Sequence, residues 1–93
     1  MASGATETSD GLDARRRRVL WRAWHRGTRE MDLVMGRFAD RELRRMPDAD
    51  LDEFERLIEA QDRDVFAWVT GAEPTPANYD GPVFRRLRQM HLG

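Results

Sequence analysis

The feature that most constrains the fold is the spacing of the apolar residues, which from Leu12 onward recur every three or four positions. This spacing places them on one face of an α-helix. No segment of strand length alternates with the period of two that a half-buried β-strand requires. Glycine and proline interrupt the pattern at short intervals, so each helix is short. The pattern therefore predicts an all-α fold, a compact bundle of five helices.

Residues that begin or end helices predict the limits of the first two segments. The first helix starts near Leu12, where Asp13 can cap it, and Gly27 can end it because glycine accepts a positive φ. The second helix spans about 29–43, and Met46-Pro47 interrupts the pattern after it. These signals are local, so they predict helix limits without reference to tertiary contacts.

Similar signals predict the third helix. It starts at Asp48 or Asp50, and Asp50 and Glu53 have the spacing of a capping box, in which each side chain bonds the other residue's backbone N–H.

The last two helices follow a short interval. Asp62 is expected to cap the fourth helix, Gly71 to end it, and Pro82 to open the fifth after a proline-containing loop. The residues expected to face inward are Leu12, Val19, Leu20, Ala23, Trp24, Met31, Val34, Met35, Phe38, Leu43, Leu51, Phe54, Leu57, Ile58, Val65, Phe66, Trp68, Val69, Val83, Phe84, Leu87 and Met90.

The length of 93 residues allows one small domain, predicted over residues 12–93, after a polar and acidic tail over residues 1–11 that is expected to be disordered. The absence of cysteine excludes thiolate chemistry and disulfides, and two histidines are too few for a histidine-rich metal centre. No apolar run approaches the ~20 residues that span a bilayer, and no secretory signal precedes the helices. We therefore expect a cytoplasmic protein with no catalytic residue, no metal and no inserted membrane segment.

Basic residues are unevenly distributed although the net charge is only −1, and all sixteen are arginine. Seven lie within residues 15–29, and four of them follow one stripe of the first helix: Arg15, Arg18, Arg22 and Arg26. Trp21 and His25 flank this stripe. Three interpretations fit: a solvated face, a surface for an acidic protein partner, or a phosphate-binding face for nucleic acid. No helix-turn-helix pattern supports the last of these.

The junction of the first two helices carries a second candidate site. Gly27 has no Cβ, so a second backbone can approach it closely, and Arg26 and Glu30 place opposite charges on either side. The simpler interpretation is a glycine that ends a helix beside an incidental local ion pair. The alternative is a docking surface on an exposed turn.

The junction also resembles a known family. Arg26-Gly27-x-x-Glu30, within the run Trp24–Asp32, matches the RGxxE signature of the FAD assembly factors, also called succinate dehydrogenase assembly factor 2. The segments Phe54–Glu59, Asp62–Trp68 and Pro74–Leu87 are similar to later parts of the same family, in the same order. The similarity covers roughly Arg15–Met90, nearly all of the predicted folded part.

The resemblance implies a five-helix bundle that is not an enzyme. Such proteins bind the flavoprotein subunit of succinate dehydrogenase, and in bacteria often that of fumarate reductase, and promote covalent attachment of FAD to a histidine of that subunit. The resemblance implies no stably bound cofactor, and we expect a monomer when free. The expected partner-binding residues are, from the signature, Arg26, Gly27 and Glu30; beside it, His25, Arg29 and Asp32; and from the stripe, Arg18 and Arg22.

Two other functions remain open at this stage. The alternative from a different class is a small arginine-rich, nucleic-acid-associated regulatory protein that uses the face from Arg15 to Arg29. A small enzyme is the third, although the sequence offers no nucleophile with a companion base.

Overall fold

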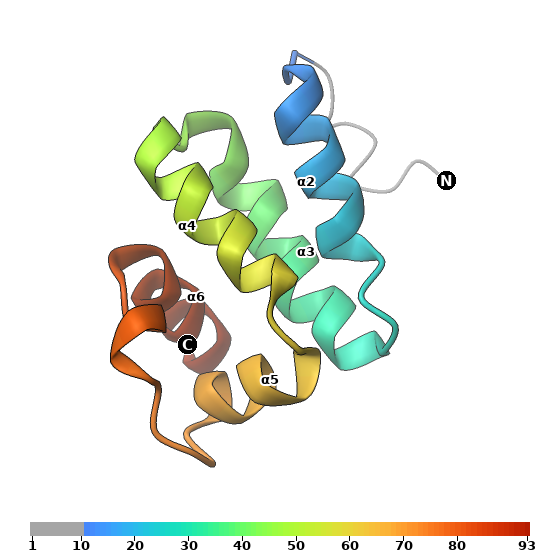
Figure 1. Ribbon diagram of the computed structural model, residues 1–93. Coiled ribbons are helices and arrows are strands. Elements are labelled where there is room, and N and C mark those ends of the chain that lie inside the picture. Colours follow the sequence, from blue (N-terminus) through green and yellow to red (C-terminus); the bar gives the residue numbers. More distant parts are fainter. Residues whose placement is uncertain (1–10) are drawn as a thin grey trace. The chain divides into compact units, whose positions relative to one another are not determined.

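The computed structural model describes residues 11–93, which form five α-helices, two short 3₁₀-helices and no β-strand (Figure 1). The all-α prediction with five helices is confirmed. The chain divides into two compact units, one ending at Met46 and the other beginning at Pro47. The predicted tail lies outside the described residues, except for Gly11, an exposed turn residue. The single domain over residues 12–93 stays a prediction.

The first unit contains α2 (Ala14–Trp24), α3 (Arg29–Glu42) and the 3₁₀-helix η1 (Leu43–Arg45), and α2 packs against α3. Asp13 caps α2 as predicted, because its Oδ1 accepts a hydrogen bond of 2.8 Å from the backbone N–H of Arg16. This hydrogen bond is the largest cause that lowers the pKa of Asp13 below its usual value. The cap therefore fixes where α2 begins.

Arg16 ties the start of α2 to the end of the first unit. Its Nε donates to the carbonyl of Leu43 at 3.2 Å and its Nη2 to the carbonyl of Met46 at 2.5 Å. The carbonyl of Leu43 also accepts from the backbone N–H of Met46 at 3.3 Å, so the guanidinium adds a second donor there and reaches the carbonyl of Met46 beyond the helical segment. These contacts join the start of α2 to the segment that follows α3, and the two helices pack together, so α2 and α3 run antiparallel.

Trp24 fixes the other end of the same pair of helices. A Cβ at Gly36 would lie 2.2 Å from the Trp24 ring, so the indole packs directly on the backbone of α3. Its Nε1 donates to Oδ1 of Asp40 at 3.2 Å. Trp24 is only half-buried, and this packing holds the last turn of α2 beside α3.

The second unit contains α4 (Asp48–Glu59), α5 (Asp62–Thr70), the 3₁₀-helix η2 (Ala77–Tyr79) and α6 (Pro82–Leu92), with α6 packed against α4 and α5. Gly71 ends α5 with φ +83°, and Pro82 opens α6, both as predicted. The prediction that Asp62 caps α5 was wrong. Asp62 is the first helical residue, where a negative charge is favourable, and the capping position is Gln61, which makes no side-chain cap.

The predicted capping box of α4 was also wrong. Asp48 is the first residue of α4, and Pro47 before it offers no side-chain cap. Glu53 is instead buried, and its carboxylate accepts hydrogen bonds from the backbone N–H groups of Val83 (3.2 Å) and Phe84 (3.0 Å). A carboxylate from α4 therefore caps the N-terminus of α6.

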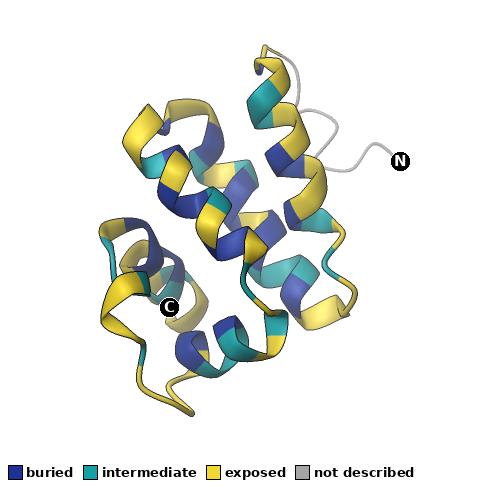
Figure 2. Ribbon diagram, in the orientation of Figure 1, coloured by how far each residue is buried: buried dark blue, intermediate teal, exposed yellow. Residues whose placement is uncertain are grey.

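Most residues predicted to face inward are buried, and each helix has a buried and an exposed side (Figure 2). The exceptions are half-buried: Trp24, Val34, Phe66 and Met90. The buried apolar residues of the first unit are Leu12, Val19, Leu20, Ala23, Met31, Met35, Phe38, Ala39, Leu43 and Met46. Those of the second unit are Leu51, Phe54, Leu57, Ile58, Val65, Trp68, Val69, Val83, Phe84 and Leu87.

Candidate docking site

Helix α2 ends at Trp24, three residues before the glycine that was predicted to end it. The capping residue is His25, whose backbone N–H donates to the carbonyl of Arg22 at 3.2 Å. The imidazole Nδ1 lies 2.6 Å from the carbonyl oxygen of Trp21. A carbonyl only accepts hydrogen bonds, so Nδ1 must be the donor. His25 therefore satisfies two carbonyls of the last turn, with its backbone and with its ring.

The beginning of α3 holds the other side of the same turn. Oγ1 of Thr28 caps the helix by accepting from the backbone N–H of Met31 at 3.2 Å. Oδ1 of Asp32 accepts from the backbone N–H of Arg26 at 2.5 Å. Asp32 thus reaches back from the first turn of α3 and fixes the path of the chain at Arg26. The sequence named Asp32 as a neighbour of the signature but gave no signal for this contact.

Gly27 lies exposed within this braced turn. Its φ of +119° is a backbone conformation that residues other than glycine rarely adopt, and a Cβ built there would lie more than 4 Å from every atom of residues 11–93 outside its chain neighbours. The conformation explains why glycine is needed, and the open space allows another backbone to approach. The two interpretations of Gly27 are therefore compatible: the turn requires glycine, and the surface above it is open.

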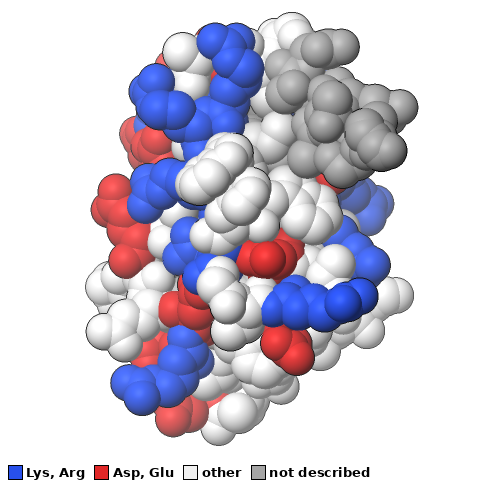
Figure 3. All heavy atoms as spheres, turned by 90° about the vertical axis from the view of Figure 1, so that its right-hand side faces the viewer, with Lys and Arg blue, Asp and Glu red and all other residues white. Residues whose placement is uncertain are grey.

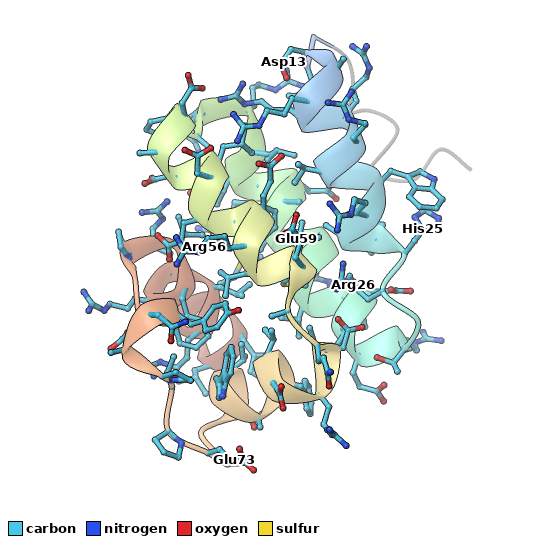
Figure 4. The ribbon with its side chains drawn as sticks, viewed as in Figure 1. Asp13, His25, Arg26, Arg56, Glu59 and Glu73 are labelled. Atoms are coloured by element: carbon cyan, nitrogen blue, oxygen red, sulfur yellow. The ribbon has the colours of Figure 1, made fainter. Side chains whose placement is uncertain are left out.

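The two signature charges have different surroundings. Arg26 is half-buried in the turn beyond the end of α2 (Figure 4). The prediction that it belongs to the arginine stripe of that helix was therefore wrong. Its Nη1 lies 3.5 Å from the carbonyl of Arg22. Glu30 is exposed in the first turn of α3, and within residues 11–93 its carboxylate has no hydrogen bond or ion pair. The local ion pair between Arg26 and Glu30, which the simpler interpretation of this junction included, is therefore absent from the described part of the chain.

The remaining predicted site residues surround this turn. Arg18 and Arg22 are exposed on α2, Arg29 is the exposed first residue of α3, and Arg15 is half-buried. Local hydrogen bonds bring together four of the predicted residues, namely Arg22, His25, Arg26 and Asp32. The contribution of each residue to partner binding stays a prediction.

Sequence reasoning did not foresee the arrangement of two aromatic residues at this site. The rings of Trp21 and His25 stack, with centroids 4.0 Å apart and planes inclined by 13°. Trp21 is 62% exposed. Their spacing of four residues was the available signal, because residues at i and i+4 lie side by side on a helix. In Figure 4 the labelled His25 points outward from the helices.

Across residues 11–93, no group of three or more His, Asp or Glu side chains is arranged to hold a metal ion. In the same range, no helix is both long and apolar enough to cross a membrane.

Comparison with known proteins places this surface in a family. Residues 17–91, which include the whole junction, match the family described as "Flavinator of succinate dehydrogenase". "FAD assembly factor SdhE" of Acetobacter pasteurianus is 38% identical over 86 residues, which cover 92% of this chain and 77% of that protein. No solved structure gives a significant match.

Mitochondrial relatives are similar but longer. "Succinate dehydrogenase assembly factor 2, mitochondrial" of Mycosarcoma maydis is 41% identical over 71 residues, 76% of this chain and 30% of the relative. The protein of the same name from Danio rerio is 33% identical over 83 residues, 87% of this chain and 52% of the relative. These names favour the assembly-factor interpretation over the nucleic-acid alternative. The resemblance inferred from the RGxxE run is confirmed, and the chain belongs to the family of flavinators of succinate dehydrogenase.

Proposed function

We propose that this protein is an assembly factor that binds the flavoprotein subunit of succinate dehydrogenase and promotes covalent attachment of FAD to that subunit. The match over residues 17–91 to the flavinator family supports the proposal. So do the names of its relatives, which describe succinate dehydrogenase assembly and FAD assembly. The protein acts as a binding partner and supplies no catalytic group.

The structural observation that carries the proposal is the open backbone at Gly27. Docking two protein surfaces through a turn requires a fixed backbone, space above it and charges that select the partner. Asp32 fixes the turn from α3, and His25 fixes it from α2. Among residues 11–93, no atom outside the chain neighbours of Gly27 lies within 4 Å of its Cβ position, so a partner's backbone can approach there. Arg26 and Glu30 on either side provide charges of both signs.

The proposed mechanism uses the turn as a docking surface whose backbone is held by hydrogen bonds. Covalent flavinylation requires the target histidine of the flavoprotein and the 8α-methyl group of its flavin to be aligned, with negative charge stabilised on the isoalloxazine. A protein that binds the aligned conformation more tightly shifts the flavoprotein toward it, by as much as the two affinities differ. Arg26 pairs with a carboxylate of the flavoprotein, and Glu30 pairs with a cation on it.

The remaining properties belong to the same proposal. FAD stays with the flavoprotein, and the assembly factor holds no cofactor stably. The fumarate reductase flavoprotein is a second partner of the same chemistry. The protein acts in the cytoplasm and is a monomer when free.

The direct test is complementation. A host that lacks its own assembly factor is supplied with this chain, and in-gel flavin fluorescence of the succinate dehydrogenase flavoprotein is compared with and without it. We expect covalent flavin to rise severalfold when the chain is present. Equal fluorescence with and without the chain, at equal flavoprotein levels, would contradict the proposed function.

A further inference from the structure

Trp21 is an unusual residue to leave in water. Within residues 11–93 the only large hydrophobic residues classed as exposed are Trp21, at 62%, and Leu92, at 66%. Leu92 is next to the last residue of the chain, whereas Trp21 lies within a helix. Tryptophan is among the side chains that most often dominate binding energy at protein interfaces, because its large ring buries much apolar area.

The indole is also held in place before any partner arrives. The His25 ring stacks on it, and Nδ1 of His25 is anchored to the carbonyl of Trp21 itself at 2.6 Å. His25 is therefore held both by its backbone N–H, which donates to the carbonyl of Arg22, and by its ring. A side chain that is already ordered loses less conformational entropy on binding, so this pair is prepared for contact.

The charges around the pair indicate what kind of surface covers it. Residues 14–29 contain seven arginines and no carboxylate. One helical turn before Trp21 lie Arg17 and Arg18, both exposed, and Arg22 is exposed beside it. Figure 3 shows blue arginine side chains among uncharged atoms, with several red carboxylates on the same face of the molecule. The complementary surface is therefore anionic where it meets α2.

Glu30 narrows the choice of partner further. This exposed carboxylate lies only three residues beyond Gly27 and has no partner within residues 11–93. A nucleic acid or an anionic membrane presents negative charge throughout and would repel Glu30. A folded protein can present carboxylates toward α2 and a cation toward Glu30. The mixed charge of the surface thus favours a protein partner.

We propose that Trp21 and His25 form an aromatic anchor that inserts into an apolar hollow, rimmed by carboxylates, on the flavoprotein subunit. The anchor is a second contact, next to the turn at Arg26, Gly27 and Glu30, and contributes most of the apolar binding energy. This inference rests on the proposed function, because it takes the flavoprotein as the partner.

The test measures binding of purified flavoprotein subunit to variants of the full chain. Trp21→Ala is expected to raise Kd about tenfold or more, while Trp21→Phe retains much of the affinity. Leu92→Ala is the matched control, because it removes the other exposed apolar side chain and should leave Kd unchanged. His25→Ala should weaken binding severalfold, whereas His91→Ala, which removes another exposed histidine, should not.

A second measurement keeps the test independent of folding. The chain is labelled with 5-fluorotryptophan, and the Trp21 resonance is identified by its loss in Trp21→Phe. We expect this resonance to shift on addition of flavoprotein more than those of Trp24 and Trp68. An unmoved Trp21 resonance in the complex would overturn the anchor.

Other outcomes separate the anchor from the proposed function. If wild-type chain binds and flavinylates the flavoprotein but Trp21→Ala binds equally well, the anchor is wrong and the function stands. If wild-type chain does neither, the proposed function itself fails. Two further results would also overturn the anchor. In each, flavoprotein binding does not depend on Trp21, whereas self-association of the chain or its binding to a DNA oligonucleotide does.

Discussion

At the scale of single residues, Gly27 has two separate properties that a substitution can distinguish. Its positive φ is a requirement of the turn, and the open space above it is a property of the surface. Gly71 offers a matched comparison, because it also has a positive φ, +83°, and its Cβ position likewise has no neighbour within 4 Å in the described part of the chain, apart from the adjoining residues. Both glycines are exposed. The two positions therefore share the backbone requirement but not the proposed docking role.

We expect Gly27→Ala and Gly71→Ala each to lower the free energy of unfolding by about 1 kcal/mol, because alanine is strained at positive φ. Only Gly27→Ala should also lower covalent flavin per flavoprotein in complemented cells. Chemical denaturation and in-gel flavin fluorescence measure the two effects. Equal flavinylation by the two variants would show that Gly27 serves the turn alone.

Asp32 is expected to act through Arg26. Asp32→Ala removes the acceptor for the backbone N–H of Arg26. It should cost about 1–2 kcal/mol of unfolding free energy and reduce flavinylation, because the turn loses its fixed path. Asp32→Asn keeps a side-chain carbonyl as acceptor and should restore most of both.

The distinguishing readout for Asp32 is hydrogen exchange of the Arg26 amide. It should accelerate strongly in Asp32→Ala and little in Asp32→Asn. If Asp32→Asn loses flavinylation while the amide stays protected, the carboxylate contacts the partner directly and the positioning role is wrong.

The residue scale also shows which site features the sequence could predict. An exposed turn at Gly27 between Arg26 and Glu30 could be predicted, because a glycine between opposite charges is visible in five consecutive letters, whereas its role in partner binding stays a prediction. The Asp32 contact and the stack of Trp21 on His25 were not. The Asp32 contact depends on the path of the chain through residues 25–28, which residue types alone do not determine, whereas the spacing of Trp21 and His25 allowed a stack without requiring it.

At the scale of helices, local signals predicted where most helices begin and end to within a few residues. They did not reveal contacts between residues far apart in the sequence. The second helix was expected over 29–43 and is observed as Arg29–Glu42, because its start and end follow from residues next to it. Glu53 shows the opposite case. Its spacing from Asp50 favoured a capping box, but its carboxylate bonds the start of a helix thirty residues later. A tertiary partner therefore outweighed the local one.

Glu53→Ala should destabilise the protein by about 2–3 kcal/mol, because it leaves the backbone N–H groups of Val83 and Phe84 buried without an acceptor. Glu53→Gln keeps one oxygen acceptor and should lose less. The neighbouring Asp52→Ala is the control, since Asp52 is exposed on the same helix. Urea denaturation measures all three. A Glu53→Ala variant as stable as Asp52→Ala would contradict the capping role.

At the scale of the whole molecule, the near-zero net charge conceals a separation of charge along the chain. Residues 15–29 hold seven arginines, whereas residues 48–64 hold eight carboxylates and two arginines. Exposed charges contribute little to folding but attract a partner of opposite charge over a distance of about 10 Å at moderate salt. We therefore expect the arginines of α2 to contribute more to the rate of association with a partner than to the free energy of unfolding.

The double variant Arg18→Ala/Arg22→Ala is expected to keep its thermal midpoint within about 2 °C, because both side chains are exposed. Its association rate with the flavoprotein should fall severalfold at low salt, and the difference should shrink as salt rises. Stopped-flow association at several ionic strengths measures this. A rate equal to wild type at low salt would exclude α2 as a steering surface.

The central claim is that the turn at Arg26, Gly27 and Glu30 carries the function, and removing its charges without changing its backbone tests this most directly. Arg26→Ala and Glu30→Ala are compared with two controls that each remove an exposed charge elsewhere, Arg37→Ala and Glu73→Ala. Circular dichroism should show all four variants folded.

The measurement is covalent flavin per flavoprotein in a host lacking its own assembly factor, complemented with each variant at equal expression. The account predicts at least about tenfold less flavin with Arg26→Ala and with Glu30→Ala, and wild-type levels with both controls. Wild-type flavin from both Arg26→Ala and Glu30→Ala would contradict it.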